Sequence, residues 1–152
     1  DVQKDHARLL EAAMARLAEA HPGRIAFRQG YDAALAHRMF AAGDLAIIPS
    51  RFEPCGLTQM QAMRYGTVPI VRRTGGLADT VLNFDRAAGR GTGIVFNDFD
   101  TPAMAWAFTR ALTLYADTSA FVKLVQNGMA QDFSWGRQAA EYVALYEGLL
   151  TR

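Results

Sequence analysis

The chain has 152 residues, of which 51% are hydrophobic and 20% charged, and its formal net charge is +1. This length fits about one globular domain, and the small net charge excludes a strong field that would attract nucleic acid or a membrane surface. The single cysteine, Cys55, excludes an intrachain disulfide and is compatible with a reducing cytoplasm, and no apolar run approaches the roughly 18 residues of a membrane span.

Hydrophobic periodicity predicts alternating helices and strands over the first two thirds of the chain. In chain order, the predicted elements are a helix over 3–20, a strand over 25–29, a helix over 33–42, a strand over 45–49, a helix over 56–65, a strand over 68–71, helical turns over 77–82 and a strand over 93–96. Asp32 is the expected N-cap of the second helix, and Gly66 is expected to end the third. Pro69 lacks an amide donor, so its strand is expected either to lie near an edge or to enter the sheet at Pro69.

Only helical patterns follow residue 100. Thr101 is the expected N-cap of the first of these helices, with Pro102 at the first helical position, and two more helices are expected over 118–131 and 136–150. Alternation of helix and strand predicts a doubly wound parallel sheet of the Rossmann-like α/β class, with helices added at its C-terminal end. Because the pattern starts inside a helix, at Asp1, we expect one partial domain that lacks the first strand of its sheet.

Glu53 is the sharpest candidate for a functional side chain. It follows the apolar strand that ends at Pro49, and it stands between Phe52 and Pro54 in a turn. Parallel α/β sheets bind ligands at the carboxyl ends of their strands, so a carboxylate at this point is expected to face a ligand crevice. A solvated turn acid is the alternative that the spacing leaves open.

The residues after Glu53 supply backbone donors for an anion. Gly56, Leu57 and Thr58 open a predicted helix, and the first amides of a helix lack partners and lie at the positive end of its dipole. Gly56 also lets a ligand approach the backbone closely. A phosphate site is therefore one interpretation of this stretch, and an ordinary helix start is the other.

The next strand ends in a polar, glycine-rich segment, Arg72-Arg73-Thr74-Gly75-Gly76. Two arginines can neutralise a diphosphate or meet a carboxylate, and the glycines keep the backbone flexible. Successive strand residues point to opposite sides, so we expect at most one of Arg72 and Arg73 to face the crevice. The alternative is that both are solvent-exposed loop arginines.

Among the remaining candidates, Tyr31 follows a predicted strand, where its ring can stack on a base or pack at the sheet edge. Cys55 has no neighbouring histidine in the sequence and is expected to be inert. No spacing of His, Cys, Asp or Glu resembles a metal site, and no cofactor is expected. Trp106 and Trp135 are expected to pack in the core or between helices.

Three blocks of the sequence closely resemble bacterial glycogen synthases and plant starch synthases. They are Ser50–Gln59 (SRFEPCGLTQ), Arg64–Pro69 (RYGTVP) and Arg72–Val81 (RRTGGLADTV). Gly30-Tyr31 and Asp132-Phe133-Ser134-Trp135 match as well, so the resemblance covers essentially the whole chain. It implies the C-terminal, nucleotide-sugar-binding half of a two-domain glycosyltransferase of GT-B architecture.

The activity that this resemblance implies is retaining transfer of glucose from ADP-glucose to the non-reducing end of an α-1,4-glucan such as glycogen. The implied location is a bacterial cytoplasm, or a plastid if the source is a plant. The family pattern implies these site residues: Glu53 as the acid beside the donor glucose; Cys55, Gly56 and Leu57 around the glucose and distal phosphate; Thr58 near the ribose and phosphates; and Tyr31 on the adenine.

The chain departs from the family pattern at two points. Gln61 stands where the wider superfamily often has a second glutamate for the ribose, and an amide can still hydrogen-bond there. The basic residues that grip the diphosphate belong to a segment before Asp1, and the acceptor side belongs to an N-terminal domain. The resemblance therefore implies that these 152 residues are inactive alone and require their own N-terminal domain.

Two other functions remain open at this point. One is a related retaining glycosyltransferase that uses a UDP-sugar, and the other is a non-catalytic module that binds adenine nucleotides. A dinucleotide-dependent oxidoreductase does not fit, because no G-x-G-x-x-G follows a strand.

Overall fold

The computed structural model describes residues 2–150, and the chain divides into two compact units, one up to Leu35 and one from Ala36 onward. In the first unit, helix α1 runs over Val2–Ala20, in agreement with its amphipathic pattern. Helix α2, Ala33–Ala42, spans the boundary between the units. The Leu35 amide donates to the Asp32 carboxylate at 2.9 Å, which confirms Asp32 as the cap of α2.

The strand predicted over 25–29 is wrong. These residues are not assigned to a strand, and no β-pairing involves them within the described chain. Burial of their side chains still alternates from Ile25 to Arg28, as the sequence pattern indicated. A strand is defined by a hydrogen-bonded neighbour, however, and alternation alone does not supply one.

The second unit is built on a parallel sheet in the order β1-β2-β3, comprising Leu45–Ile48, Val68–Arg72 and Ile94–Phe96. Helix α3, Thr58–Tyr65, connects β1 to β2, and α4, Gly75–Thr80, follows β2. These parallel pairings confirm the predicted α/β class.

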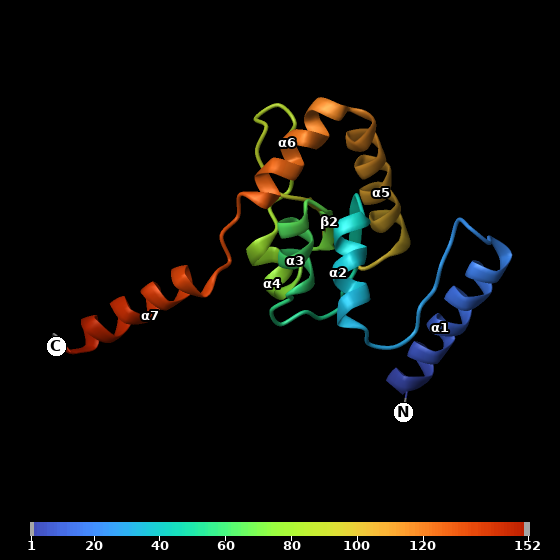
Figure 1. Cartoon of the computed structure of the whole chain (residues 1–152), viewed down its shortest axis with the longest axis horizontal. Helices are drawn as coiled ribbons and strands as arrows, with labels where there is room; N and C mark the ends of the chain where they lie inside the picture. The colour runs from blue at the N-terminus through green and yellow to red at the C-terminus, as the bar shows by residue number, and fades with distance from the viewer. Residues whose placement is uncertain (1, 151–152) are drawn as a thin grey trace. The chain divides into compact units, whose positions relative to one another are not determined.

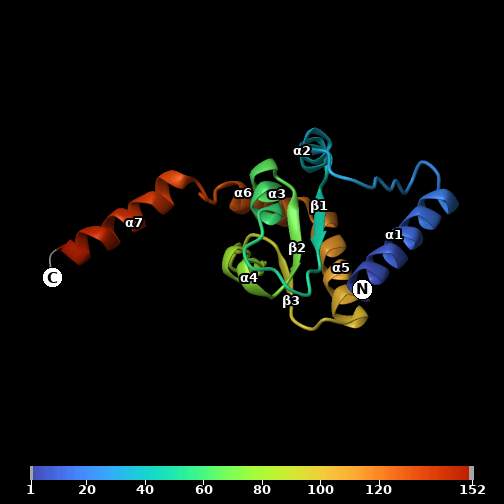
Figure 2. The same cartoon turned by 90° about the horizontal axis from the view of Figure 1, so that it is seen from below.

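Helices cover both faces of the sheet, and Figure 2 shows α4 and α5 on opposite sides of it. On one face, Ile70 and Ile94 pack in a buried cluster with residues of α5, Thr101–Ala116, and α6, Thr118–Met129. On the other face, Val71 of β2 packs in a cluster with Met63 of α3 and Leu77 of α4. Consecutive residues of β2 thus enter two separate cores, which explains the nearly continuous apolar sequence of the strands.

Pro69 lies in the central strand, so the edge position, one of the two expected, is wrong. The strand enters the sheet at Val68, one residue before Pro69. The Val68 amide donates to the Asp44 carbonyl at 2.9 Å, toward β1. Neighbouring residues of a strand direct their amides to opposite sides, so the position of the missing Pro69 donor faces β3. Pairing with β3 begins only at the next residue, where Ile70 is in register with Ile94, and no ladder bond is lost.

The chain ends in α5, α6 and α7, of which α7 covers Trp135–Leu150 (Figure 1). The cap of α5 is Asp100, whose carboxylate accepts from the Ala103 amide at 2.8 Å, and not Thr101 as predicted. Asp117 caps α6 in the same way, through the Ala120 amide. A carboxylate satisfies the free amides of a helix start and also complements the helix dipole.

The Asp117 cap predicts a pH-dependent contribution to stability. Hydrogen bonds from the Ala120 amide and the Ser119 hydroxyl, and the charge of Arg86, lower the pKa of Asp117 below the ordinary 3.8. The stabilisation is therefore complete above about pH 3.8 and disappears as pH falls through the lower, folded pKa. Thermal unfolding of the wild type and of Asp117→Ala should differ at pH 7 and converge toward pH 2. An equal difference at both pH values would contradict this assignment.

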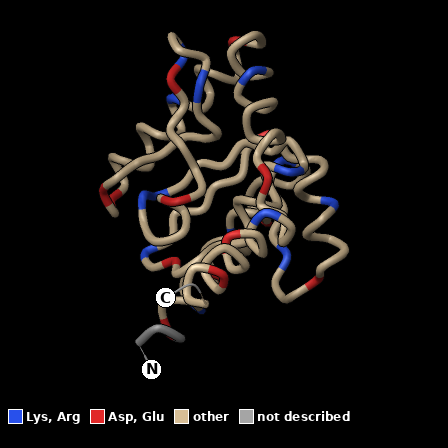
Figure 3. The backbone as a smooth tube through the Cα atoms, turned by 90° about the vertical axis from the view of Figure 1, so that its left-hand side faces the viewer, with Lys and Arg blue, Asp and Glu red and all other residues tan. Residues whose placement is uncertain are grey.

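Charges of both signs are mixed along the chain, as Figure 3 shows. None of the helices within residues 2–150 combines the length and the apolarity needed to cross a bilayer. Among the same residues, no group of His, Cys, Asp and Glu side chains is placed to hold a metal ion.

Candidate functional site at the carboxyl edge of the sheet

Three loops leave the sheet at the carboxyl ends of its strands, and hydrogen bonds connect them. Arg72, at the end of β2, donates through Nη1 to the carbonyl of Arg51, which follows β1, at 3.1 Å. Arg73 donates through Nε to Oδ1 of Asn97, which follows β3, at 3.1 Å. The loops after all three strands therefore form one continuous edge, as expected for parallel strands.

Glu53 lies half-buried in the loop between β1 and α3. The Ser50 hydroxyl donates to its carboxylate at 3.4 Å, and the Gly76 amide donates to its main-chain carbonyl at 3.2 Å. The loop that carries the acid is thus attached to the start of α4, while most of the hydrogen-bonding capacity of the carboxylate remains available. The predicted position of Glu53 at a strand end is confirmed.

Gly75 and Gly76 allow this attachment, because the two loops touch through their backbones. A Cβ on Gly75 would lie 1.7 Å from the Glu53 carbonyl oxygen, and one on Gly76 would lie 1.8 Å from the Cys55 carbonyl oxygen. Gly75 also has a positive φ of 44°. These glycines were predicted to keep the backbone flexible, whereas in this structure they allow the Glu53 loop to pack directly against α4.

Gln59 is a buried residue of this site that the sequence reasoning missed. Its side-chain amide nitrogen donates to the carbonyl of Gly56 at 2.6 Å, to Oγ1 of Thr80 at 3.0 Å and, more distantly, to the carbonyl of Cys55 at 3.4 Å. The Thr80 hydroxyl in turn donates to the Gly76 carbonyl at 2.6 Å. A chain of hydrogen bonds therefore connects the Glu53 loop to both ends of α4.

Replacing Gln59 by leucine should lower the free energy of unfolding by about 1 kcal/mol, since the variant removes the donor to the part-buried Gly56 carbonyl and Thr80 hydroxyl. Gln61→Leu makes the same exchange at an exposed position two residues further along α3 and serves as the matched control. Urea unfolding of both variants checks this prediction, and equal midpoints for the two would contradict it.

The predicted anion-binding stretch begins α3, although the helix starts at Thr58 and not at Gly56. Gly56 has a φ of 75°, the left-handed region that favours glycine, and it turns the chain into the helix. No side chain caps the first turn of α3, and Cys55, Leu57 and Thr58 are all exposed beside it. No side chain competes for the first amides of α3 among the described residues, and anion binding by Gly56, Leu57 and Thr58 stays a prediction.

The two arginines after β2 have different surroundings. The Arg72 guanidinium lies 5.4 Å from the centre of the Phe99 ring, and its Nε is buried with no hydrogen-bond partner in the described chain. Arg73 is exposed and bonds to Asn97. Both side chains contact the segment after β3, and the expectation that at most one of them faces a ligand stays a prediction.

The binding roles of Tyr31 and Gln61 stay predictions, and both side chains are exposed. Tyr31 is 96% exposed and belongs to the first unit. Gln61 is exposed on α3 and lines a hollow of about 470 Å³ with residues 128–134. Asp132 in this hollow has its pKa lowered by hydrogen bonds from Ser134 and by the charges of Arg137 and Arg64.

Comparison with known proteins agrees with this geometry. Residues 4–128 match the family model for glycosyl transferases group 1. The chain is 55% identical over 139 residues to a glycogen synthase of Anaeromyxobacter dehalogenans, and 51% identical over 141 residues to one of Rhodospirillum rubrum. These matches cover 91% and 93% of the chain, but the chain spans only 29% of the length of each relative.

A solved structure gives the same picture of the fold. The catalytic domain of starch synthase IV from Arabidopsis thaliana, bound to ADP and acarbose, superposes with a TM-score of 0.84 at 40% identity. The match covers 95% of this chain and 30% of that one. Sucrose-phosphate synthase from Thermosynechococcus elongatus also matches, with a TM-score of 0.66 at 27% identity over 91% of this chain and 34% of its own. On this evidence, the chain belongs to the group 1 family of glycosyl transferases.

Proposed function

We propose that this chain is the nucleotide-sugar-binding part of a glycogen synthase, which transfers glucose from ADP-glucose to the non-reducing end of an α-1,4-glucan with retention. The observation that carries the proposal is the half-buried Glu53 on a loop fixed at the carboxyl edge of the sheet, in a chain about half identical to proteins named glycogen synthase. The ADP and acarbose bound to the Arabidopsis domain support a nucleotide donor and a glucan-like acceptor.

The proposed reaction separates positive from negative charge, and the Glu53 loop supplies a group of the opposite sign for each. The bond between the anomeric carbon and the diphosphate oxygen breaks, and a bond from that carbon to the glucan hydroxyl forms, while the hydroxyl proton passes to the leaving diphosphate. The sugar acquires positive charge in the transition state. Glu53 favours that charge and fixes the sugar, and the open amides at the start of α3 favour the negative diphosphate.

The remaining site residues take positions around this centre in the proposal. Cys55, Gly56 and Leu57 surround the glucose and the distal phosphate with their backbone, and Thr58 lies near the ribose and phosphates. Tyr31 stacks on the adenine, and Gln61 bonds to the ribose. Arg72 and Arg73 contribute positive charge at the end of β2.

A complete site also needs parts that the longer relatives contain. We propose that residues 1–152 form a partial C-terminal domain, and that the grip on the diphosphate and the acceptor come from preceding segments. The 29% share of each relative's length is consistent with this division. A bacterial cytoplasm is the proposed location, since these relatives are bacterial.

Incorporation of labelled glucose into glycogen tests the proposal directly. A chain that joins these residues to the remainder of a glycogen synthase should elongate glycogen with ADP-glucose, and residues 1–152 alone should not. Preference for UDP-glucose would point to a different glycosyltransferase. Binding of ADP without any transfer by the longer chain would show a non-catalytic module and overturn the proposal.

A further inference from the structure

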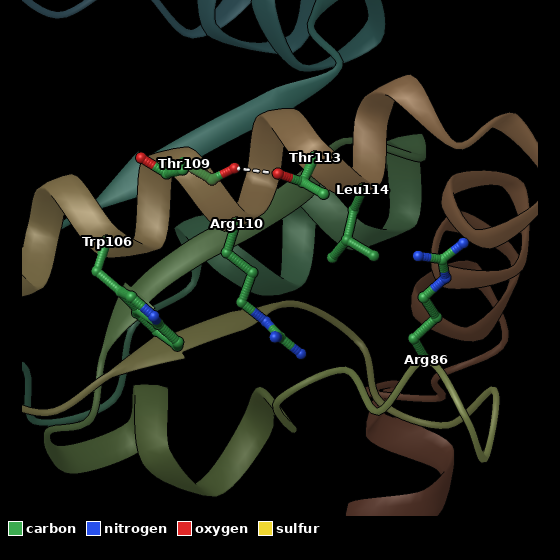
Figure 4. A pocket seen from close by; sticks show the side chains of 6 residues that line it. All are labelled: Arg86, Trp106, Thr109, Arg110, Thr113 and Leu114. Carbon is green, nitrogen blue, oxygen red and sulfur yellow. Dashed lines mark hydrogen bonds between the residues drawn. The ribbon is translucent and has the colours of Figure 1, made fainter.

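A second hollow lies away from the carboxyl edge of the sheet. It has a volume of about 300 Å³ and is formed by one side of α5 together with the segment that precedes β3. This volume is at the lower end of the range for small-molecule sites. The lining residues are Arg86, Trp106, Thr109, Arg110, Thr113 and Leu114 (Figure 4).

Hydrogen-bond donors exceed their protein partners in this hollow. Nη2 of Arg110 donates to the Phe84 carbonyl at 2.6 Å, but its Nε is buried and has no partner within the described chain. A guanidinium carries five N–H groups and no acceptor, so several donors of Arg110 remain unused. The indole N–H of Trp106 has no hydrogen bond to residues 2–150 either. Its ring, expected in the core or between helices, is 52% exposed.

The arrangement of these side chains directs the donors to one place. Figure 4 shows Arg110 between Trp106 and Arg86, with its guanidinium pointing away from the axis of α5 toward the segment before β3. The Arg110 guanidinium also lies 5.8 Å from the centre of the Trp106 ring, so this contact restricts its movement. The hydroxyls of Thr109 and Thr113 donate to carbonyls of their own helix. Within the described chain, neither hydroxyl is hydrogen-bonded to the Arg110 guanidinium.

The charge around the hollow is positive. Arg86 and Arg110 line it, and none of the residues that line it is acidic. The nearest acid by contact is Asp117, which pairs with Arg86. Its carboxylate also accepts from Ala120 and Ser119, so its charge is shared among several donors. The Nε of Arg110 is closed to solvent, so the donors that an anion in the hollow can reach are the Nη groups of Arg110 and the indole N–H of Trp106. An oxygen anion supplies acceptors for these donors.

We propose that this hollow is a binding site for a phosphate group, either the free ion or the end of a small phosphate ester. Arg110 and Arg86 provide charged donors, Trp106 provides a neutral one, and Leu114 forms an apolar wall for an attached organic group. The residues that line this hollow precede β3 or lie along α5, whereas the Glu53 loop follows β1. The site is thus distinct from the one that carries the proposed transfer, and it does not depend on it.

Titration of the ¹⁵N-labelled chain at constant ionic strength tests this site. Inorganic phosphate should shift the indole signal of Trp106 in a saturable way, and that signal is identified by its loss in Trp106→Phe. Glucose 1-phosphate and glucose form the second and third arms. Tighter binding of the ester than of free phosphate would assign the site to a phosphate ester, equal or weaker binding would assign it to the free ion, and glucose should not bind.

Arginine variants distinguish a specific phosphate site from general attraction of phosphate to the positive surface. Arg110→Gln and Arg86→Gln should each weaken phosphate binding by about tenfold, the effect of losing one charge-assisted hydrogen bond. Arg90→Gln removes the same charge from an exposed position on the same loop that does not line the hollow, and it should change the affinity by less than about twofold.

Two results would overturn the proposal. One is a Trp106 signal that does not move with either phosphate probe, including the case in which phosphate binds only beside Arg72. The other is equal weakening by Arg90→Gln and by the two pocket variants, which would indicate diffuse attraction. If circular dichroism shows that Arg110→Gln does not fold, Arg86→Gln decides the matter, since its side chain is largely exposed.

Discussion

Replacing Glu53 by glutamine should lower kcat for glucose transfer by a hundredfold or more, on the order of the loss seen when one preorganised polar partner of a charged transition state is removed. The change keeps the size of the side chain and removes only its charge. The Ser50 hydroxyl can still donate to the amide oxygen, and the bond from the Gly76 amide goes to the main chain. The loop should therefore keep its position while the developing positive charge on the sugar loses its partner.

The measurement is steady-state elongation of glycogen by the longer chain that joins these residues to the rest of a glycogen synthase. Glu19→Gln is the matched control, because it removes a carboxylate from an exposed position of α1. A larger effect on kcat than on KM is expected, since the interaction is strongest in the transition state. A Glu53→Gln enzyme with turnover close to that of Glu19→Gln would remove Glu53 from the proposed mechanism.

The sequence predicted the elements that local chemistry determines. The ends of α1 and α2 follow from an amphipathic stripe and from the Asp32 cap, and Gly66 ends α3 with a φ of 86°, as its position before a strand indicated. The placement of Glu53 and Arg72 at strand ends needed only the alternation of helix and strand. Such features depend on a few neighbouring residues, which one sequence contains in full.

The errors concern features that depend on residues distant in the sequence. An edge position was one of two expectations for Pro69, because proline has no amide donor. Pairing of β2 with β3 begins only at Ile70, so no donor is needed at Pro69 in the central strand. In α3 the apolar residues Leu57, Met60 and Met63 follow a helical spacing and would be the expected buried stripe. The buried face instead contains Gln59, Ala62 and Met63, whose spacing of three and four residues also fits a helix.

The contacts of Gln59 could not be predicted for the same reason, because one of its partners is distant in the sequence. A glutamine in a helical pattern is usually counted with the polar face, and nothing near it in the sequence indicates that Thr80 lies within 3.0 Å of its amide. The only local signal was its position three residues after Gly56, whose carbonyl it bonds. Burial of a polar side chain becomes informative only once the fold shows which loops it connects.

Replacing Gly76 by alanine should displace the Glu53 loop and destabilise the second unit. The new methyl group would lie 1.8 Å from the carbonyl oxygen of Cys55, a distance that neither backbone can tolerate without moving. Forcing an extra carbon into a packed region costs about 1–3 kcal/mol. The bond from the Gly76 amide to the Glu53 carbonyl should be lost in the same movement, so the variant should lose activity as well as stability.

Two measurements check this prediction. Urea unfolding of residues 1–152 should show a lower midpoint for Gly76→Ala, and the longer chain that carries the same change should have a raised KM for ADP-glucose. Gly136→Ala in α7 is the control, because its Cβ would meet only Ser134 Oγ at 3.7 Å, and a helical alanine is expected to stabilise by about 0.5–1 kcal/mol. If Gly76→Ala unfolds at the wild-type midpoint and binds donor normally, the contact between α4 and the Glu53 loop does not position the acid.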